Sequence, residues 1–171
     1  MSDSAQHSDA IDATGAADND NVELRLEEFF DGSLEAEGEF RDPFGRVRRT
    51  FNAKVTGKRT GDTIRVHEKF HYHDGEIDER EWLIRAHGEG RYTGQASDVI
   101  GIAEGTVEGR RLRWSYPIDL PIGGRAWRLK FEDEFELSEA DALINTASVT
   151  KFGLPVGTVR QTISRTSQKR R

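Results

Sequence analysis

The sequence predicts an all-β protein that folds as a single antiparallel up-and-down barrel of about ten strands, with one short N-terminal helix. Three observations carry this prediction. The 171 residues suit one domain, and 17 glycines against 4 prolines indicate many turns. Apolar residues also alternate with polar ones through most of the chain. Such alternation is typical of antiparallel strands that bury one face.

The two ends of the chain differ in composition from the rest. Residues 1–21 carry five aspartates and no lysine or arginine. A polar, acidic segment of this kind cannot offset the entropy lost on ordering. The end of the chain, 166–171, includes Lys169, Arg170 and Arg171. We therefore expect a disordered acidic tail over 1–21, a barrel domain over 22–165 and a basic C-terminal tail over 166–171.

A short helix is predicted over 22–30, before the strands begin. Leu26, Phe29 and Phe30 fall at helical spacing, and Asn21 can cap the first turn. The Asp-Gly pair at 31–32 ends the helix. We expect its apolar side to cover one end of the barrel.

Strands follow, each ending at a turn signal such as Asp-Gly or Gly-Gly. In 62–73, for example, Ile64, Val66, Phe70 and Tyr72 share one face. The predicted strands span 33–41, 46–57, 62–73, 77–87, 91–97, 101–107, 110–118, 125–137, 142–150 and 156–165. An open sheet of ten strands would leave two unpaired edges, whereas closure removes both. A two-sheet sandwich is the alternative, but hairpin-length links between nearly all neighbours favour the barrel.

Four charged residues occupy the apolar faces of predicted strands: Arg49, Glu68, Arg80 and Asp133. Unpaired burial of such groups would be costly, so they should pair with one another or meet a ligand. Strand alternation predicts that they point into the barrel, and that Arg49 contacts Glu68 or Asp133. The functional interpretation is an arginine that anchors the carboxylate head group of a ligand. The alternative is a fixed structural network, or positions near the rim of the barrel.

Aromatic residues share these inward faces. The candidate ligand-binding set therefore adds Tyr72, Trp82, Trp114, Tyr116 and Trp127. Aromatic side chains inside a barrel of this size either line a ligand cavity or fill it. Both alternatives stay open from the sequence.

Other chemistry is predicted to be absent. Cysteine does not occur, which excludes disulfides, a cysteine nucleophile and thiolate metal sites. His67, His71 and His73 alternate onto the polar face, so we expect a solvated surface there and no metal site or cofactor. Asp98 precedes a tight connection and is expected to bond turn amides. The net charge of −6 disfavours nucleic acid as a partner. The sequence contains no run of 18 apolar residues, so no membrane-spanning helix is predicted.

Five segments, in order, give the chain a family resemblance: FFDGSLEAEGEFRDPFGRVRRTF, FHYHDGEIDEREW, GRYTGQASDVIGIAEG, LRWSYPIDLPIGGRAWRLKFEDEFEL and INTASVTKFGLPVG. Together they resemble the family of domain of unknown function 3833, from about Phe29 to Arg165. The resemblance implies a bacterial source and a lipocalin-like barrel, but no reaction. Many members are predicted lipoproteins with an N-terminal lipid-attachment cysteine. This sequence shows neither that cysteine nor a secretory signal, so a cytoplasmic location is expected.

Three classes of function remain. The leading expectation is a non-enzymatic protein that binds a small amphipathic or lipidic ligand inside the barrel. The second is an enzyme that acts on such a ligand through an internal carboxylate, Glu68 or Asp133. The third is a structural or interaction protein with a filled core. Ligand identity, oligomeric state and pathway do not follow from the sequence.

Overall fold

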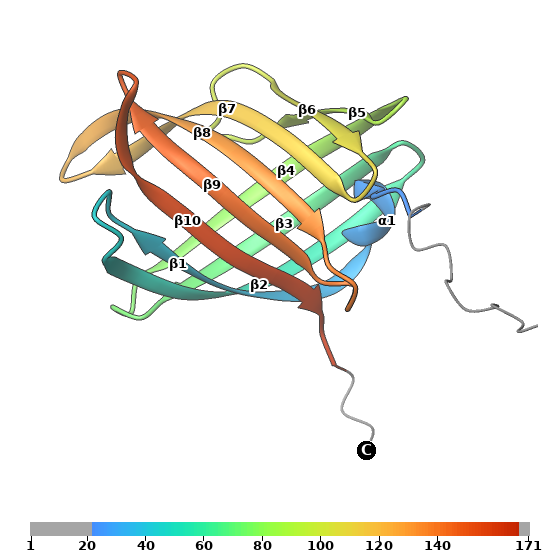
Figure 1. Cartoon of the computed structure of the whole chain (residues 1–171), viewed down its shortest axis with the longest axis horizontal. Coiled ribbons are helices and arrows are strands. Elements are labelled where there is room, and N and C mark those ends of the chain that lie inside the picture. The colour runs from blue at the N-terminus through green and yellow to red at the C-terminus, as the bar shows by residue number, and fades with distance from the viewer. Residues whose placement is uncertain (1–21, 168–171) are drawn as a thin grey trace, which may run out of the picture.

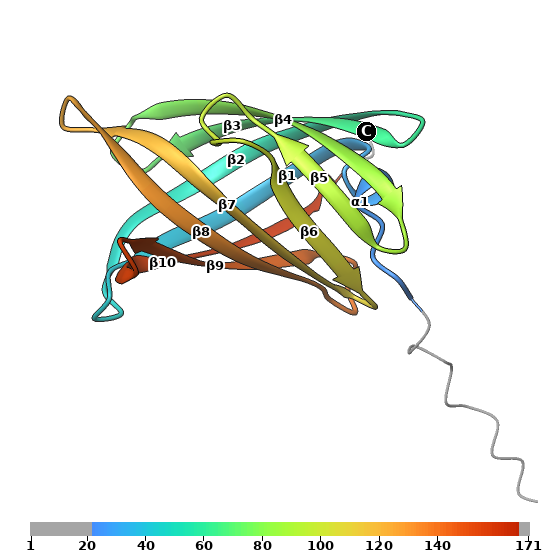
Figure 2. The ribbon, with the colours of Figure 1, turned by 90° about the horizontal axis from the view of Figure 1, so that it is seen from above.

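In the computed structural model, which describes residues 22–167, ten antiparallel strands close into one barrel (Figures 1 and 2). Each strand pairs with its neighbours in sequence, and β1 pairs with β10 to complete the ring. The elements are α1 (Leu26–Phe29), β1 (Gly32–Arg41), β2 (Val47–Thr60), β3 (Thr63–Tyr72), β4 (Ile77–Gly88), β5 (Arg91–Gln95), β6 (Ala103–Glu108), β7 (Arg111–Ile122), β8 (Arg125–Leu137), β9 (Leu143–Lys151) and β10 (Leu154–Arg165). The predicted up-and-down barrel is confirmed. The predicted tails over 1–21 and 168–171 lie outside the described residues.

The strands begin and end close to the predicted positions, with two differences. The helix is shorter than expected because Arg25 is extended and the Leu24 N–H donates to Gly109 O. Strand β7 continues past 118 to Ile122 and contains Pro117 and Pro121, although proline cannot donate to a ladder. Both prolines lie beyond Ser115, where the pairing of β7 with β6 ends, so the missing N–H groups cost that ladder nothing.

One end of the barrel is covered by α1 and the residues around it (Figure 1). Leu24, Leu26, Phe29 and Phe30 are all buried there. Glu27 is buried too and accepts a hydrogen bond from the Tyr92 hydroxyl at 2.6 Å. This is the closed end, as the amphipathic pattern of the N-terminal segment predicts.

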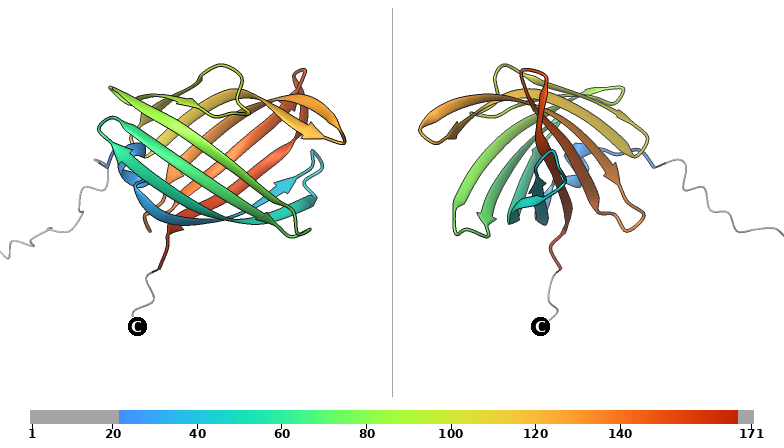
Figure 3. Two further views of the ribbon diagram at one scale, coloured as in Figure 1. Left: turned by 180° about the vertical axis from the view of Figure 1, so that it is seen from behind. Right: turned by 60° about the vertical axis from the view of Figure 1, so that its left-hand side comes forward.

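The opposite end is the mouth, formed by the turns β1–β2, β3–β4, β7–β8 and β9–β10 (Figure 1). Seen from behind, β2 to β4 form the near wall that runs up to it (Figure 3, left). Exposed apolar side chains lie on each of these turns or at the strand ends beside them: Phe44, Ile77, Ile122, Phe152 and Leu154. Among the described residues, no helix has the length and apolarity needed to cross a membrane.

Candidate functional site

The barrel interior, here called the lumen, holds a cluster of charged side chains at mid-depth. Glu68 on β3 lies directly opposite Arg80 on β4, and both belong to the inward face. The Arg80 guanidinium donates from Nε and Nη2 to Asp98 in the loop between β5 and β6, at 2.8–3.2 Å. Asp98 thus pairs with a lumen arginine, a role that its position in a predicted turn did not indicate. Burial lowers the pKa of Arg80, but Glu68 and Asp98 outweigh that effect and raise it.

Asp133 on β8 reaches the same region from the opposite wall. It is only 8% exposed, and its Oδ2 accepts a hydrogen bond from the Tyr116 hydroxyl at 3.2 Å. Its Oδ1 has no hydrogen-bond partner. Burial raises the pKa of Asp133 to about 7, against the opposing effects of Tyr116 and Arg80. Burial likewise raises the pKa of Glu68, and that carboxylate further raises the pKa of Asp133.

Asn145 on β9 is a second buried polar group with an unused atom. It is 2% exposed, and its Oδ1 accepts a hydrogen bond from Gln161 Nε2 at 3.2 Å. Its Nδ2 has no partner. Asn145 pairs with Phe135, two residues along β8 from Asp133, so the two side chains are diagonal neighbours on the lumen face. The lumen therefore presents a free acceptor and a free donor on adjacent strands.

An aromatic wall surrounds these polar groups. Trp82 meets Trp114 edge-on at 5.8 Å between ring centres and Tyr116 at 5.1 Å, while Phe131 stacks on Tyr116 at 5.6 Å. Gly94 and Gly105 make room for Trp114, because a Cβ at either position would lie within 2.5 Å of its ring. The ring of Trp114 is thus held in place by two glycines on neighbouring strands.

Several inward-facing side chains keep accessible surface, among them Glu68, Phe135 and Gln161. Because their neighbours in the sequence lie on the outer face of the strands, this surface is on the inward side of the barrel wall. A separate hollow of about 640 Å³ lies on the outer face of β6 to β9, where Glu132, Glu134 and Ser148 line it. A second, of about 430 Å³, lies outside β2 to β4. Neither is the lumen.

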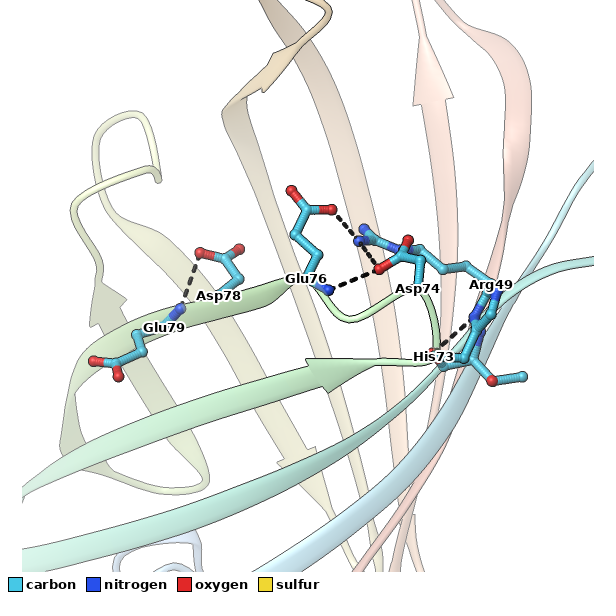
Figure 4. A network of polar contacts seen from close by, with 7 residues as sticks. Arg49, His73, Asp74, Glu76, Asp78 and Glu79 are labelled. Carbon is cyan, nitrogen blue, oxygen red and sulfur yellow. Dashed lines mark hydrogen bonds and ion pairs between the residues drawn. The ribbon is translucent and has the colours of Figure 1, made fainter.

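Arg49 does not contact Glu68 or Asp133, so that prediction is wrong. It lies at the mouth, where its guanidinium donates to Asp74 at 3.0 Å and also pairs with Glu76 (Figure 4). The same guanidinium stacks over the ring of Tyr72 at 3.4 Å. Strand alternation places Arg49 on the inward face, but Arg49 lies only two residues after the start of β2, so the acids of the β3–β4 turn are its nearest partners.

Trp127 also lies at the mouth, away from the other tryptophans. It is 37% exposed, and Lys151 Nζ lies 3.3 Å from its ring centre. The structure therefore brings together Glu68, Arg80, Trp82, Trp114, Tyr116 and Asp133, and leaves Arg49, Tyr72 and Trp127 at the rim.

His67 is on the outer surface as predicted, and its Nε2 lies 3.2 Å from a carboxylate oxygen of Glu79. No group of residues in the described part of the chain is arranged to hold a metal ion.

The raised pKa of Asp133 has a consequence for stability. A carboxyl whose folded-state pKa lies above its unfolded value stabilises the fold when protonated, and this contribution is lost as pH rises through about 7. From pH 7.5 to pH 6 the free energy of unfolding should therefore rise by about 1 kcal/mol more in the wild type than in Asp133→Asn. Urea unfolding at both pH values measures this difference. Equal changes in the two proteins would contradict the assignment.

Comparisons with known proteins agree with the barrel fold. The family model described as "Protein of unknown function (DUF3833)" matches residues 8–165. No curated protein matches. Among solved structures, the S-type phycobiliprotein lyase CPES from Guillardia theta is similar, with a TM-score of 0.62 at 13% sequence identity. The match covers 85% of this chain and 95% of the lyase, and it shows a shared fold.

Proposed function

We propose, from the premise that this chain belongs to the DUF3833 family of proteins of unknown function, that it binds a small amphipathic molecule in its lumen without converting it. The observation that carries this proposal is the pair of unused polar atoms, Asp133 Oδ1 and Asn145 Nδ2. Buried polar atoms are nearly always hydrogen-bonded in folded proteins. A ligand that supplies a donor and an acceptor would satisfy both atoms.

The surroundings of these atoms support an amphipathic ligand. Trp82, Trp114 and Phe131 offer apolar surface beside the polar groups, the combination found in small-molecule sites. The apolar residues of the mouth, with Phe44 84% and Phe152 92% exposed, suit the passage of a partly apolar molecule. The closed barrel has ten strands, and barrel diameter grows with strand number from the eight-stranded barrels that can hold one small ligand.

Titration with N-phenyl-1-naphthylamine, a neutral fluorescent probe, tests the proposal. We expect saturable binding to the wild type and weakening by about tenfold or more in Ala147→Phe. Ala147 is buried on the lumen face directly opposite Asp133, so the added ring occupies the space of the probe. Ser148→Phe is the matched control, because its side chain points outward from the next position.

The second lumen variant, Ala36→Leu on β1, adds bulk to the buried face two strands away from Ala147 and guards against misfolding of the first variant. Equal binding by Ala147→Phe, Ala36→Leu and Ser148→Phe would place the probe outside the barrel. Absence of binding to the wild type would favour a filled core. Native mass spectrometry of the purified protein then shows whether a small molecule is retained.

One observation favours a second candidate, an enzyme. A carboxyl with a pKa of about 7 is matched to general acid–base catalysis at neutral pH, and Asp133 has that value. Tyr116, hydrogen-bonded to Asp133, is the second group that would reach a bound molecule. Conversion of a co-purified molecule by the wild type, lost in Asp133→Asn, would establish this function and displace the binding proposal.

A further inference from the structure

The lumen carries more acidic than basic groups at mid-depth. Arg80 is the one cation there among the described residues, and Asp98 occupies both its Nε and Nη2. Arg49 is neutralised at the mouth by Asp74 and Glu76, and Lys151 lies at the mouth on Trp127. The charge of each guanidinium group is therefore already offset by two carboxylates, Asp98 and Glu68 for Arg80 and Asp74 and Glu76 for Arg49, so neither offers an uncompensated positive charge to an anionic head group.

Two carboxylates lack a cation of their own. Glu68 shares Arg80 with Asp98, and Asp133 has a neutral partner, the hydroxyl of Tyr116. The groups that face Asp133 from the packed elements are Tyr116, Arg80 and Glu68. An anionic ligand would add a further negative charge beside Glu68 and Asp133. A cationic ligand would instead supply the positive charge that these two carboxylates lack.

The unused polar atoms are an independent indication that a ligand belongs here. Asp133 Oδ1 is an acceptor without a donor, and Asn145 is 98% buried with an unpartnered Nδ2. A protonated amine donates up to three hydrogen bonds and would reach Asp133 Oδ1. An oxygen atom near that amine would accept from Asn145 Nδ2. The aromatic rings of Trp82 and Tyr116 would stabilise the cation further.

Building on the proposed function, we infer that the lumen binds an amphipathic organic cation, with its amine between Glu68 and Asp133 and its apolar part along Trp114 and Phe131. This assigns the ligand a charge opposite to that of a fatty acid. It also gives Glu68 a role as the second carboxylate of the amine site, opposite Arg80.

Competition against bound N-phenyl-1-naphthylamine tests the charge of the ligand. The competitors are dodecylamine, dodecanol and dodecanoate, which share one apolar chain and are used below their micelle concentrations. At pH 8 we expect dodecylamine to displace the probe at a concentration about tenfold lower than dodecanol, with dodecanoate weakest. At pH 6, where Asp133 is mostly protonated, dodecylamine should lose about tenfold in affinity while dodecanol is unchanged.

Two variants and a control test which carboxylates bind the amine. Asp133→Asn and Glu68→Gln should each bring dodecylamine toward the affinity of dodecanol. Glu134→Gln removes the neighbouring carboxylate on the outer face and should change nothing. Equal or tighter binding of dodecanoate, or an amine affinity that is independent of pH, would overturn the inference and leave the proposed lumen site intact. Failure of the neutral probe itself to bind would instead remove the proposed function.

Discussion

Replacement of Arg80 by methionine should lower the free energy of unfolding by about 3 kcal/mol at pH 7.5. The change removes the cation that Glu68 faces and to which Asp98 is bonded at 2.8 Å. Removal of one partner leaves uncompensated charge in a poorly solvated interior, and that costs more than the pair itself contributes. The side chains of Arg80 and Asp98 are 18% and 24% exposed, so the loss stays at the low end for buried pairs.

Arg65→Met is the matched control for this experiment. Arg65 on β3 pairs with Glu81 across the outer face, where both side chains are exposed. Its replacement should cost no more than about 1 kcal/mol. The loss in Arg80→Met should also shrink at pH 5, because burial raises the pKa of Glu68, which then takes up a proton and no longer carries an uncompensated charge. Urea unfolding gives both values, and equal losses in the two variants would show that Arg80 does not hold the lumen together.

Gly57→Ala should destabilise the barrel by about 3 kcal/mol or more. Gly57 lies on β2 under the closed end, and a Cβ built there would lie 1.6 Å from Phe30 O and 2.6 Å from Phe30 C. Both are backbone atoms at the C-terminal end of α1, so no side-chain rotation relieves the clash. The helix and its buried Phe29 and Phe30 must shift away from the barrel.

Thr56→Ala is the control for the glycine substitution, since Thr56 is the exposed neighbour on the same strand. It should change the free energy of unfolding by no more than about 0.5 kcal/mol. Thermal unfolding of both variants compares them directly. If Gly57→Ala matched Thr56→Ala, the closed end would have to be loosely packed, contrary to the burial of Leu26 and Phe29.

The strands could be predicted from the sequence because two signals coincide at almost every element. Alternation such as that of Ile64, Val66 and Phe70 marks the buried face, and glycine turns mark the ends. The helix was harder to predict. The apolar residues between Val22 and Phe30 fit a helix over the whole segment, whereas Arg25 is extended and only Leu26–Phe29 are helical. Its start is decided by a long-range hydrogen bond from Leu24 to Gly109, which local periodicity does not contain.

The candidate site could be predicted only in part, because alternation gives the direction of a side chain but not its depth in the barrel. Arg49 and Glu68 both have inward positions, yet one lies at the mouth and the other at mid-depth. Asn145 alternates with Leu143 and Ala147, so the reasoning that found Glu68 could have found it too. Asp98 lies between strands, where no periodicity applies, and only the fold brings it to Arg80.

The pairing of β1 with β10 determines where another molecule can be attached to the protein without facing the mouth. Leu34 lies beside Arg165, and the Thr166 N–H donates to Ser33 O, so the described chain starts and ends at the closed end. Whatever is joined before residue 22 or after residue 167 is therefore attached opposite the mouth. A tether, fusion partner or immobilising surface joined at residue 22 or residue 167 leaves the entrance to the lumen facing away from the point of attachment.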